Sequence, residues 1–129
     1  MCMEVRMNIP KLVEHGRKYA DSWCHQSKRH VSFILRGDEI VSHGANGFEV
    51  PSRYAFMGYR SLHSEVHAMI KLRGSRDGLS LINLRYNNKG DLKIAKPCKL
   101  CMPWCEAVFD NIYYSTDEKS VIRLERLYD

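Results

Sequence analysis

Pro97-Cys98-Lys99-Leu100-Cys101 carries two cysteines three residues apart, and His63-Ser64-Glu65 lies upstream of it in the chain. Two cysteines with this spacing, placed where a helix begins, can turn both sulfur atoms to one side and supply half of a tetrahedral zinc shell. A histidine from another helix would complete three protein ligands. Three ligands leave one position open for water, which separates a catalytic zinc from a structural one. We therefore predict a zinc site formed by His63, Cys98 and Cys101, with Glu65 beside it.

Two further residues compete for the metal. His67 follows His63 by four residues, and histidines at i and i+4 of a helix can share a metal ion. Two histidines and two cysteines would close the shell and leave Glu65 without a role, so we favour His63 alone. Cys105 follows Cys101 by four residues and would be a fourth ligand in a structural site. A side chain one turn deeper in the helix is instead expected to point into the core.

The composition predicts a soluble, cytoplasmic protein with one domain. The 129 residues are 44% hydrophobic and 27% charged, without a repeat or a low-complexity tract. No apolar run approaches the roughly 18 residues of a membrane helix, and the first residues lack an apolar signal-peptide core. Of five cysteines, three lie between positions 98 and 105, which favours reduced thiols, some of them on a metal, over disulfides.

The charge balance favours a polyanionic partner. The net charge is +5 and the sequence pI is about 9.0. Residues 28–30 form a short basic run, and residues 48–61 combine arginines with aromatic residues on a segment without a steady period. Such residues can stack on bases and hold phosphates. Simple solvation of the basic run, and packing of the rings onto the body of the protein, are the alternatives.

Hydrophobic periodicity and turn residues predict an alternation of helices and strands. Asn8 can cap the first helix, Gly37-Asp38 suits a hairpin turn, and four turn residues at 116–119 make the last two strands antiparallel neighbours. The predicted elements are a helix from Ile9 to Trp23, strands at 31–36 and 39–43, a helix from 61 or 62 to 72, a strand at 79–86, a returning segment at 92–95, a helix from 98 to about 110, and strands at 112–115 and 120–124.

This order of elements and the two motifs resemble the cytidine deaminase superfamily between about Ile9 and Leu124. The resemblance implies a single cytidine deaminase-like domain over residues 1–129, an α/β fold with three α/β/α layers. Its sheet would be mixed and five-stranded, with a C-terminal antiparallel hairpin. The resemblance also implies that His63, Cys98 and Cys101 bind the zinc cofactor and that Glu65 is the catalytic proton shuttle.

The sequence departs from common family patterns at two places. Ser64 stands in the middle of the H-x-E motif, where alanine or valine is common, and we expect this small change to be without effect. The short hairpin at 116–119 leaves no room for the extra helix of APOBEC-like and transfer-RNA deaminases that act on polynucleotides. The sequence looks most like short deaminase-like proteins of phages and large viruses.

The resemblance implies hydrolytic deamination of cytosine to uracil. Zinc would lower the pKa of a bound water molecule to about 7, and Glu65 would carry the proton. The basic and aromatic segments slightly favour cytosine in single-stranded DNA or RNA. A free (deoxy)cytidine or (deoxy)cytidylate deaminase is the alternative, which the C-terminal hairpin favours. A non-catalytic, zinc-containing nucleic-acid binding module is the second alternative.

Three substrate contacts are expected on the same grounds. Asn46 matches the sugar-contacting asparagine of the family, although a turn residue is the simpler explanation. A backbone carbonyl near Ala95 or Lys96 would accept a hydrogen bond from the exocyclic amine of the base. Tyr113 and Tyr114 are adjacent on a strand, so only one can face the pocket. We name Tyr114 as the ring that would stack on the base, and packing of either ring in the core is the alternative.

Overall fold

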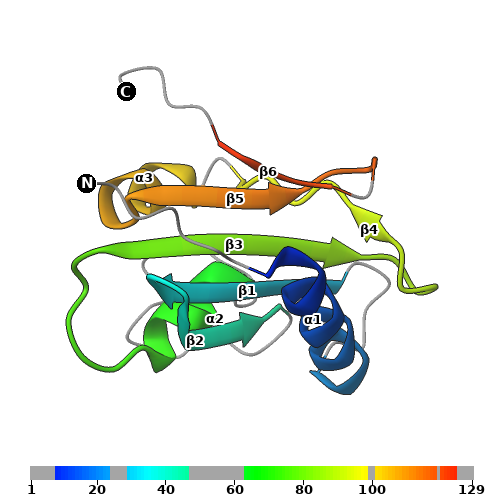
Figure 1. Cartoon of the computed structure of the whole chain (residues 1–129), viewed down its shortest axis with the longest axis horizontal. Coiled ribbons are helices and arrows are strands. Elements are labelled where there is room, and N and C mark those ends of the chain that lie inside the picture. The colour runs from blue at the N-terminus through cyan, green and yellow to red at the C-terminus, as the bar shows by residue number, and fades with distance from the viewer. Residues whose placement is uncertain (1–7, 24–28, 47–62, 99–100, 119, 125–129) are drawn as a thin grey trace.

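The computed structural model describes residues 8–23, 29–46, 63–98, 101–118 and 120–124 (Figure 1). These residues form three helices and six strands. In chain order they are α1 (Ile9–Trp23), β1 (Arg29–Arg36), β2 (Glu39–Ala45), α2 (Ser64–Lys71), β3 (Leu79–Tyr86), β4 (Leu92–Lys93), α3 (Met102–Val108), β5 (Asn111–Ser115) and β6 (Val121–Arg123).

The strands form one mixed sheet in the order β2-β1-β3-β5-β6. β1 is antiparallel to both β2 and β3, β3 is parallel to β5, and β5 is antiparallel to β6. This path is the predicted five-stranded mixed sheet, and its last pair is the predicted C-terminal hairpin. The two-residue strand β4 pairs with the end of β3 and is the sixth strand of the sheet. The sequence had predicted only a returning segment at 92–95, without a strand.

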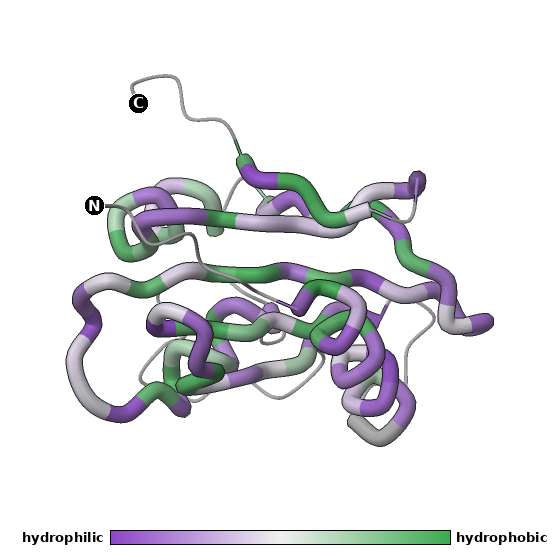
Figure 2. The backbone as a smooth tube through the Cα atoms, viewed as in Figure 1, coloured by the Kyte–Doolittle hydropathy of each residue, from purple (hydrophilic) through white to green (hydrophobic). Residues whose placement is uncertain are grey.

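Helices cover both faces of the sheet, which confirms the predicted α/β/α layers (Figure 1). On one face, Leu12 and Ala20 of α1 pack with Phe33 of β1. On the other face, Val66 of α2 and Cys105 of α3 belong to the second core. Strands covered on both faces are apolar almost throughout. Figure 2 accordingly shows hydrophobic colour along the middle of β3 and hydrophilic colour in the turn that follows it.

Polar contacts cap the start of α1 and join α1 to the start of β1. The Asn8 side chain accepts a hydrogen bond from the backbone N–H of Lys11 at 3.1 Å, so Asn8 caps α1 as predicted. β1 begins at Arg29, two residues before the predicted strand. The guanidinium group of Arg29 lies 2.8 Å from the carboxylate of Asp21 in α1. The last two residues of the basic run at 28–30, Arg29 and His30, are therefore part of the sheet.

Helices α2 and α3 both begin later than predicted. His63 precedes α2 in an extended conformation (φ −74°, ψ 152°). Cys98 is not yet helical, but its carbonyl oxygen accepts hydrogen bonds from the N–H groups of Cys101 and Met102 at 3.1 and 2.9 Å. A single turn thus precedes α3. None of the helices within the described ranges has the length and apolar character needed to cross a membrane.

Strand β2 extends two residues beyond its predicted end, through Gly44 and Ala45. A Cβ atom on Gly44 would lie 2.5 Å from the carbonyl oxygen of Ser64 and would also meet the backbone N–H of Ala68. Glycine therefore permits the backbone of α2 to lie directly on the sheet. The predicted strand stopped at residue 43, because the close packing of Gly44 against a distant helix has no local signal in the sequence.

Candidate active site

The side chains of His63, Cys98 and Cys101 lie together between the ends of two helices. Their ligand atoms are all within 4.8 Å of one another. The Nδ1 atom of His63 lies 3.5 Å from the sulfur of Cys98 and 3.4 Å from the sulfur of Cys101. A tetrahedral zinc ion with ordinary bond lengths would separate a nitrogen and a sulfur ligand by about 3.6 Å. The donor atoms and their spacing therefore fit zinc.

Local backbone structure positions these three side chains. His63 stands at the start of α2, and its carbonyl oxygen accepts the hydrogen bond of His67 N–H at 3.0 Å. The turn that Cys98 forms with Met102 brings the two cysteine sulfur atoms to the same side. Cys98 is exposed and Cys101 is buried, so the group reaches from the core to the surface. Solvent therefore reaches the group at Cys98.

The two competing residues lie outside this group. The Nδ1 atom of His67 accepts a hydrogen bond from the backbone N–H of Ala45 at 3.0 Å. Cys105 is fully buried in the core, and burial, followed by the negative charge of Glu65, raises the pKa of its thiol well above the usual range. Cys105 therefore remains a neutral core thiol. Among the described residues, only His63, Cys98 and Cys101 form such a group.

Glu65 is buried in the first turn of α2, with 5% of its surface exposed. The Ser64 hydroxyl lies 3.0 Å from its Oε1 atom. The Ser32 hydroxyl lies 2.7 Å from that of Ser64 and 2.6 Å from Asn83 Oδ1. Sequence reasoning missed Ser32 and Asn83. The available signal was that each is a polar residue between apolar neighbours, in Val31-Ser32-Phe33 and in Ile82-Asn83-Leu84.

Asn46 and Ala95, two residues predicted to contact the substrate, form hydrogen bonds within the protein. Asn46, directly after β2, accepts a hydrogen bond from the His30 backbone N–H on its Oδ1 at 3.0 Å. Its own N–H donates to the carbonyl oxygen of His30 at 3.2 Å, so Asn46 joins the end of β2 to the start of β1. Ala95 is buried, and its N–H donates to the carbonyl oxygen of Ser115 at 3.0 Å.

The two tyrosines of β5 face opposite sides of the sheet. Tyr114 packs against the core that contains Cys101 and Cys105, whereas Tyr113 packs against the core under α1. Tyr114 is thus on the face of the sheet that carries the metal-binding helices. This is the arrangement that the proposed stacking of Tyr114 on a base requires.

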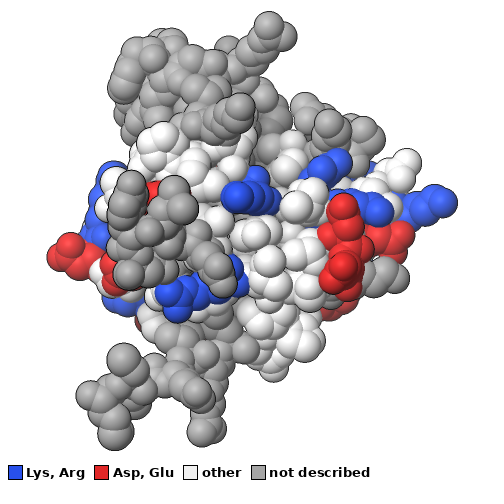
Figure 3. Space-filling model, turned by 90° about the horizontal axis from the view of Figure 1, so that it is seen from above, with Lys and Arg blue, Asp and Glu red and all other residues white. Residues whose placement is uncertain are grey.

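Positive charge is scattered over the described surface seen in Figure 3. Lys and Arg side chains occupy several separate places on this face, and Asp and Glu side chains gather toward its left and right sides. Within the described part of this face, the basic residues do not form one continuous patch. The predicted basic and aromatic segment at 48–61 lies outside the described residues.

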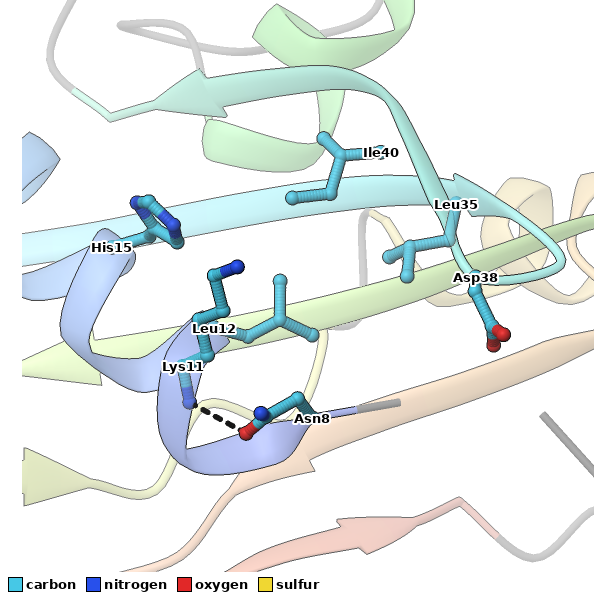
Figure 4. A pocket seen from close by; sticks show the side chains of 7 residues that line it. All are labelled: Asn8, Lys11, Leu12, His15, Leu35, Asp38 and Ile40. Atoms are coloured by element: carbon cyan, nitrogen blue, oxygen red, sulfur yellow. Dashed lines mark hydrogen bonds between the residues drawn. The ribbon is translucent and has the colours of Figure 1, made fainter. Parts of the chain in front are cut away.

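A separate cavity of about 290 Å³ lies at the other face of the sheet (Figure 4). It is situated between the start of α1 and the β1–β2 hairpin. Leu12 and Leu35 in its wall belong to the core under α1. The full lining is Asn8, Lys11, Leu12, His15, Leu35, Asp38 and Ile40. The sheet therefore separates this cavity from the His63, Cys98 and Cys101 group.

The architecture resembles that of a solved enzyme. The crystal structure of cytidine deaminase from Mycobacterium leprae superposes with a TM-score of 0.59 at 15% sequence identity, over 91% of this chain and 93% of that chain. No family model matches the chain, and no curated protein matches it in sequence. The chain therefore has the cytidine deaminase fold. Together with the His63, Cys98 and Cys101 group, this fold fits the cytidine deaminase superfamily.

Proposed function

We propose that this protein is a zinc-dependent hydrolase that deaminates cytosine to uracil. The observation that carries the proposal is the His63, Cys98 and Cys101 group, placed at the starts of α2 and α3 in a cytidine deaminase fold. His63 Nδ1 and the two thiolates would hold the zinc ion. Three protein ligands leave a fourth position for water or substrate, as a catalytic zinc site requires.

Glu65 is the proposed catalytic proton carrier. Zinc, when bound, activates a water molecule for attack on C4 of the base. Glu65 would accept one proton of this water and deliver it to the ring nitrogen, and would then take the second proton from the new C4 hydroxyl group and give it to the departing amine. A C–O bond forms, the exocyclic C–N bond breaks, and ammonia leaves. The burial of Glu65 supports this role, because a buried carboxyl group exchanges protons with bulk water less readily.

The proposal is tested with Glu65→Ala, measured for zinc content and for ammonia release. We expect an unchanged zinc content and a loss of turnover of at least about 100-fold, since general acid–base catalysis contributes about 10²- to 10⁴-fold. Glu106→Ala, which removes an exposed carboxylate from α3, is the matched control and should keep full turnover. Unchanged turnover in Glu65→Ala would refute the proton-carrier role. It would favour the non-catalytic binding module with a structural zinc.

The proposed substrate is cytosine in single-stranded DNA or RNA, supported by the net charge of +5. The alternative is free (deoxy)cytidine or (deoxy)cytidylate, which the cytidine deaminase resemblance and the direct β5–β6 hairpin both favour. A cytosine-containing DNA oligomer, deoxycytidine and deoxycytidylate should therefore be tested in parallel. An enzyme for polynucleotides should convert the oligomer and lose activity steeply with added salt. Conversion of only the free nucleoside or nucleotide would establish the alternative.

A further inference from the structure

A chain of buried polar groups connects Glu65 to the centre of the sheet. It runs from Glu65 Oε1 to the Ser64 hydroxyl at 3.0 Å, to the Ser32 hydroxyl at 2.7 Å and to Asn83 Oδ1 at 2.6 Å. Ser32, Ser64, Glu65 and Asn83 are each at most 5% exposed. Buried polar groups are costly unless they are hydrogen-bonded, so these contacts are strongly favoured over any alternative arrangement of the side chains.

The inner end of the chain lies in the two central strands of the sheet. Ser32 of β1 and Asn83 of β3 are direct register partners in the two central strands. Their apolar neighbours on the same face, Ile34 and Leu81, are fully buried. The outer end lies in the first turn of α2, whose backbone is held against β2 at Gly44. The orientation of the Glu65 carboxyl group is thus coupled to the most firmly held part of the fold.

The chain of hydroxyl groups can serve Glu65 whether or not it carries a proton. A serine hydroxyl has one proton and two lone pairs, so Ser32 donates in only one of its two bonds. When Ser32 donates to Asn83 Oδ1, Ser64 donates to Ser32 and a protonated Glu65 donates to Ser64. With the amide of Asn83 turned, its N–H donates to Ser32, Ser32 to Ser64, and Ser64 to the carboxylate.

We propose that Ser64 is a positioning residue whose hydroxyl group, held by Ser32 and Asn83, fixes the carboxyl group of Glu65 for proton transfer. The inference rests on the proposed deaminase function. It replaces the expectation that serine in the middle of the H-x-E motif is without effect. Ser64 acts through Glu65 and neither binds the metal nor contacts the substrate. A loss of this contact should therefore lower kcat and leave KM and zinc binding unchanged.

The matched control is Ser42, another buried serine that bonds to the same helix. Its hydroxyl donates to the carbonyl oxygen of Ala68 at 2.7 Å and does not contact Glu65. Ser64→Ala and Ser42→Ala thus each remove one buried hydroxyl from the contact between α2 and the sheet. We expect kcat to fall about tenfold in Ser64→Ala, the effect of one hydrogen bond to a charged group, with KM within about twofold. Ser42→Ala should keep its kcat within about twofold.

A second readout does not depend on turnover. In protein labelled with ¹³C at the glutamate δ-carbons, the resonance of Glu65 is the one lost in Glu65→Gln. It should shift in Ser64→Ala and, to a smaller extent, in Ser32→Ala, but not in Ser42→Ala. The spectra are recorded on the zinc-loaded and zinc-free protein. The Ser32→Ala variant retains Ser64, so it tests the positioning role if Ser64→Ala does not fold.

The outcomes separate the two proposals. Equal kcat values in Ser64→Ala and Ser42→Ala with an unmoved Glu65 resonance would overturn the positioning role, even if the protein is an active deaminase. The same unmoved resonance in Ser32→Ala would overturn it if Ser64→Ala were unfolded. The unaltered protein could instead convert no cytosine substrate while the Glu65 resonance still shifts in Ser64→Ala. That result would refute the deaminase function but would support the contact between Ser64 and Glu65.

Discussion

Cys98 and Cys105 are close in sequence but differ in environment. Cys98 is exposed and its sulfur lies 3.5 Å from His63 Nδ1, whereas Cys105 is buried and its thiol has a raised pKa. Cys101 is as buried as Cys105, so burial alone does not distinguish a ligand from a core thiol. Position does, because Cys105 lies outside the group formed by His63, Cys98 and Cys101. The two residues therefore provide a direct test of the proposed metal site.

We expect Cys98→Ser to lower the zinc content to well below one ion per chain, because one of three protein ligands is lost. Cys105→Ala should keep a full zinc content while losing some stability as a small core cavity forms. Zinc is measured by elemental analysis after dialysis, and stability by urea unfolding. Zinc retention in Cys98→Ser together with zinc loss in Cys105→Ala would place the metal on a different set of ligands.

At the scale of single residues, the sequence predicted the grouping of His63, Cys98 and Cys101 but not the buried hydrogen-bond chain that reaches Glu65. His63, Cys98 and Cys101 lie in short motifs in which residue type and spacing carry the chemistry. Ser32 and Asn83 acquire their role only because β1 and β3 are neighbours in register. No local pattern in either strand encodes that partnership, since it depends on the strand order of the whole sheet.

Among the elements, α2 depends on a single glycine for its position on the sheet. A methyl group at Gly44 would collide with backbone atoms of Ser64 and Ala68, which cannot rotate away as a flexible side chain would. The displacement would fall on the first turn of α2, where His63 and Glu65 stand.

We expect Gly44→Ala to destabilise the protein by about 1–3 kcal/mol, the usual cost of overpacking, and to weaken zinc binding as well. The control is Gly37→Ala in the β1–β2 turn, where φ is +62° and no atom lies within 4 Å of the added Cβ. Gly37→Ala should cost about 1–2 kcal/mol of stability through backbone strain alone and leave zinc binding unchanged. Urea unfolding and zinc titration measure the two quantities. Equal zinc affinities in both variants would contradict the proposed role of Gly44.

The order and type of the elements were predictable, but several of their ends were not. Hydrophobic periodicity predicted the position of α1, and the Gly37-Asp38 turn predicted the first hairpin, because both signals are local in the sequence. The ends of β2 and the starts of α2 and α3 depend on packing between distant segments. Gly44 continues β2 by pairing with Ser32 of β1, at a position where only glycine leaves room for α2. The cysteine spacing predicted a helix from Cys98, whereas α3 begins at Met102.

Over the whole molecule, titratable groups in two elements link stability to pH. His43 of β2 stacks on Tyr19 of α1 with ring centroids 4.4 Å apart, and His67 lies in α2. Burial, followed by the positive charge of Lys71, lowers the pKa of both histidines below 6.5. The unfolded chain then binds more protons than the folded chain below this pH. Their contribution to stability is complete above pH 6.5 and is lost as the pH falls.

We expect the free energy of unfolding of the zinc-free protein to decrease from pH 7.5 to pH 5.5. The double variant His43→Phe/His67→Gln should show a shallower decrease, because phenylalanine retains the stacking on Tyr19 and glutamine can accept the hydrogen bond of Ala45 N–H. His15→Gln, which alters an exposed histidine of α1, serves as the control and should keep the original dependence. Urea unfolding at three pH values measures the effect. An equally steep decrease in the double variant would assign the pH dependence to other groups.

The His63 and Cys98 side chains belong to parts of the chain that are separated by β3 and β4 and differ by 35 in sequence position. A metal ion held by both would be a cross-link that closes a long loop, and the entropy of an unfolded chain falls when such a loop is closed. This entropic cost grows only slowly with loop length. A change of a few residues in the length of the β3–β4 turn would therefore leave the resistance of the metal-bound chain to unfolding nearly unchanged.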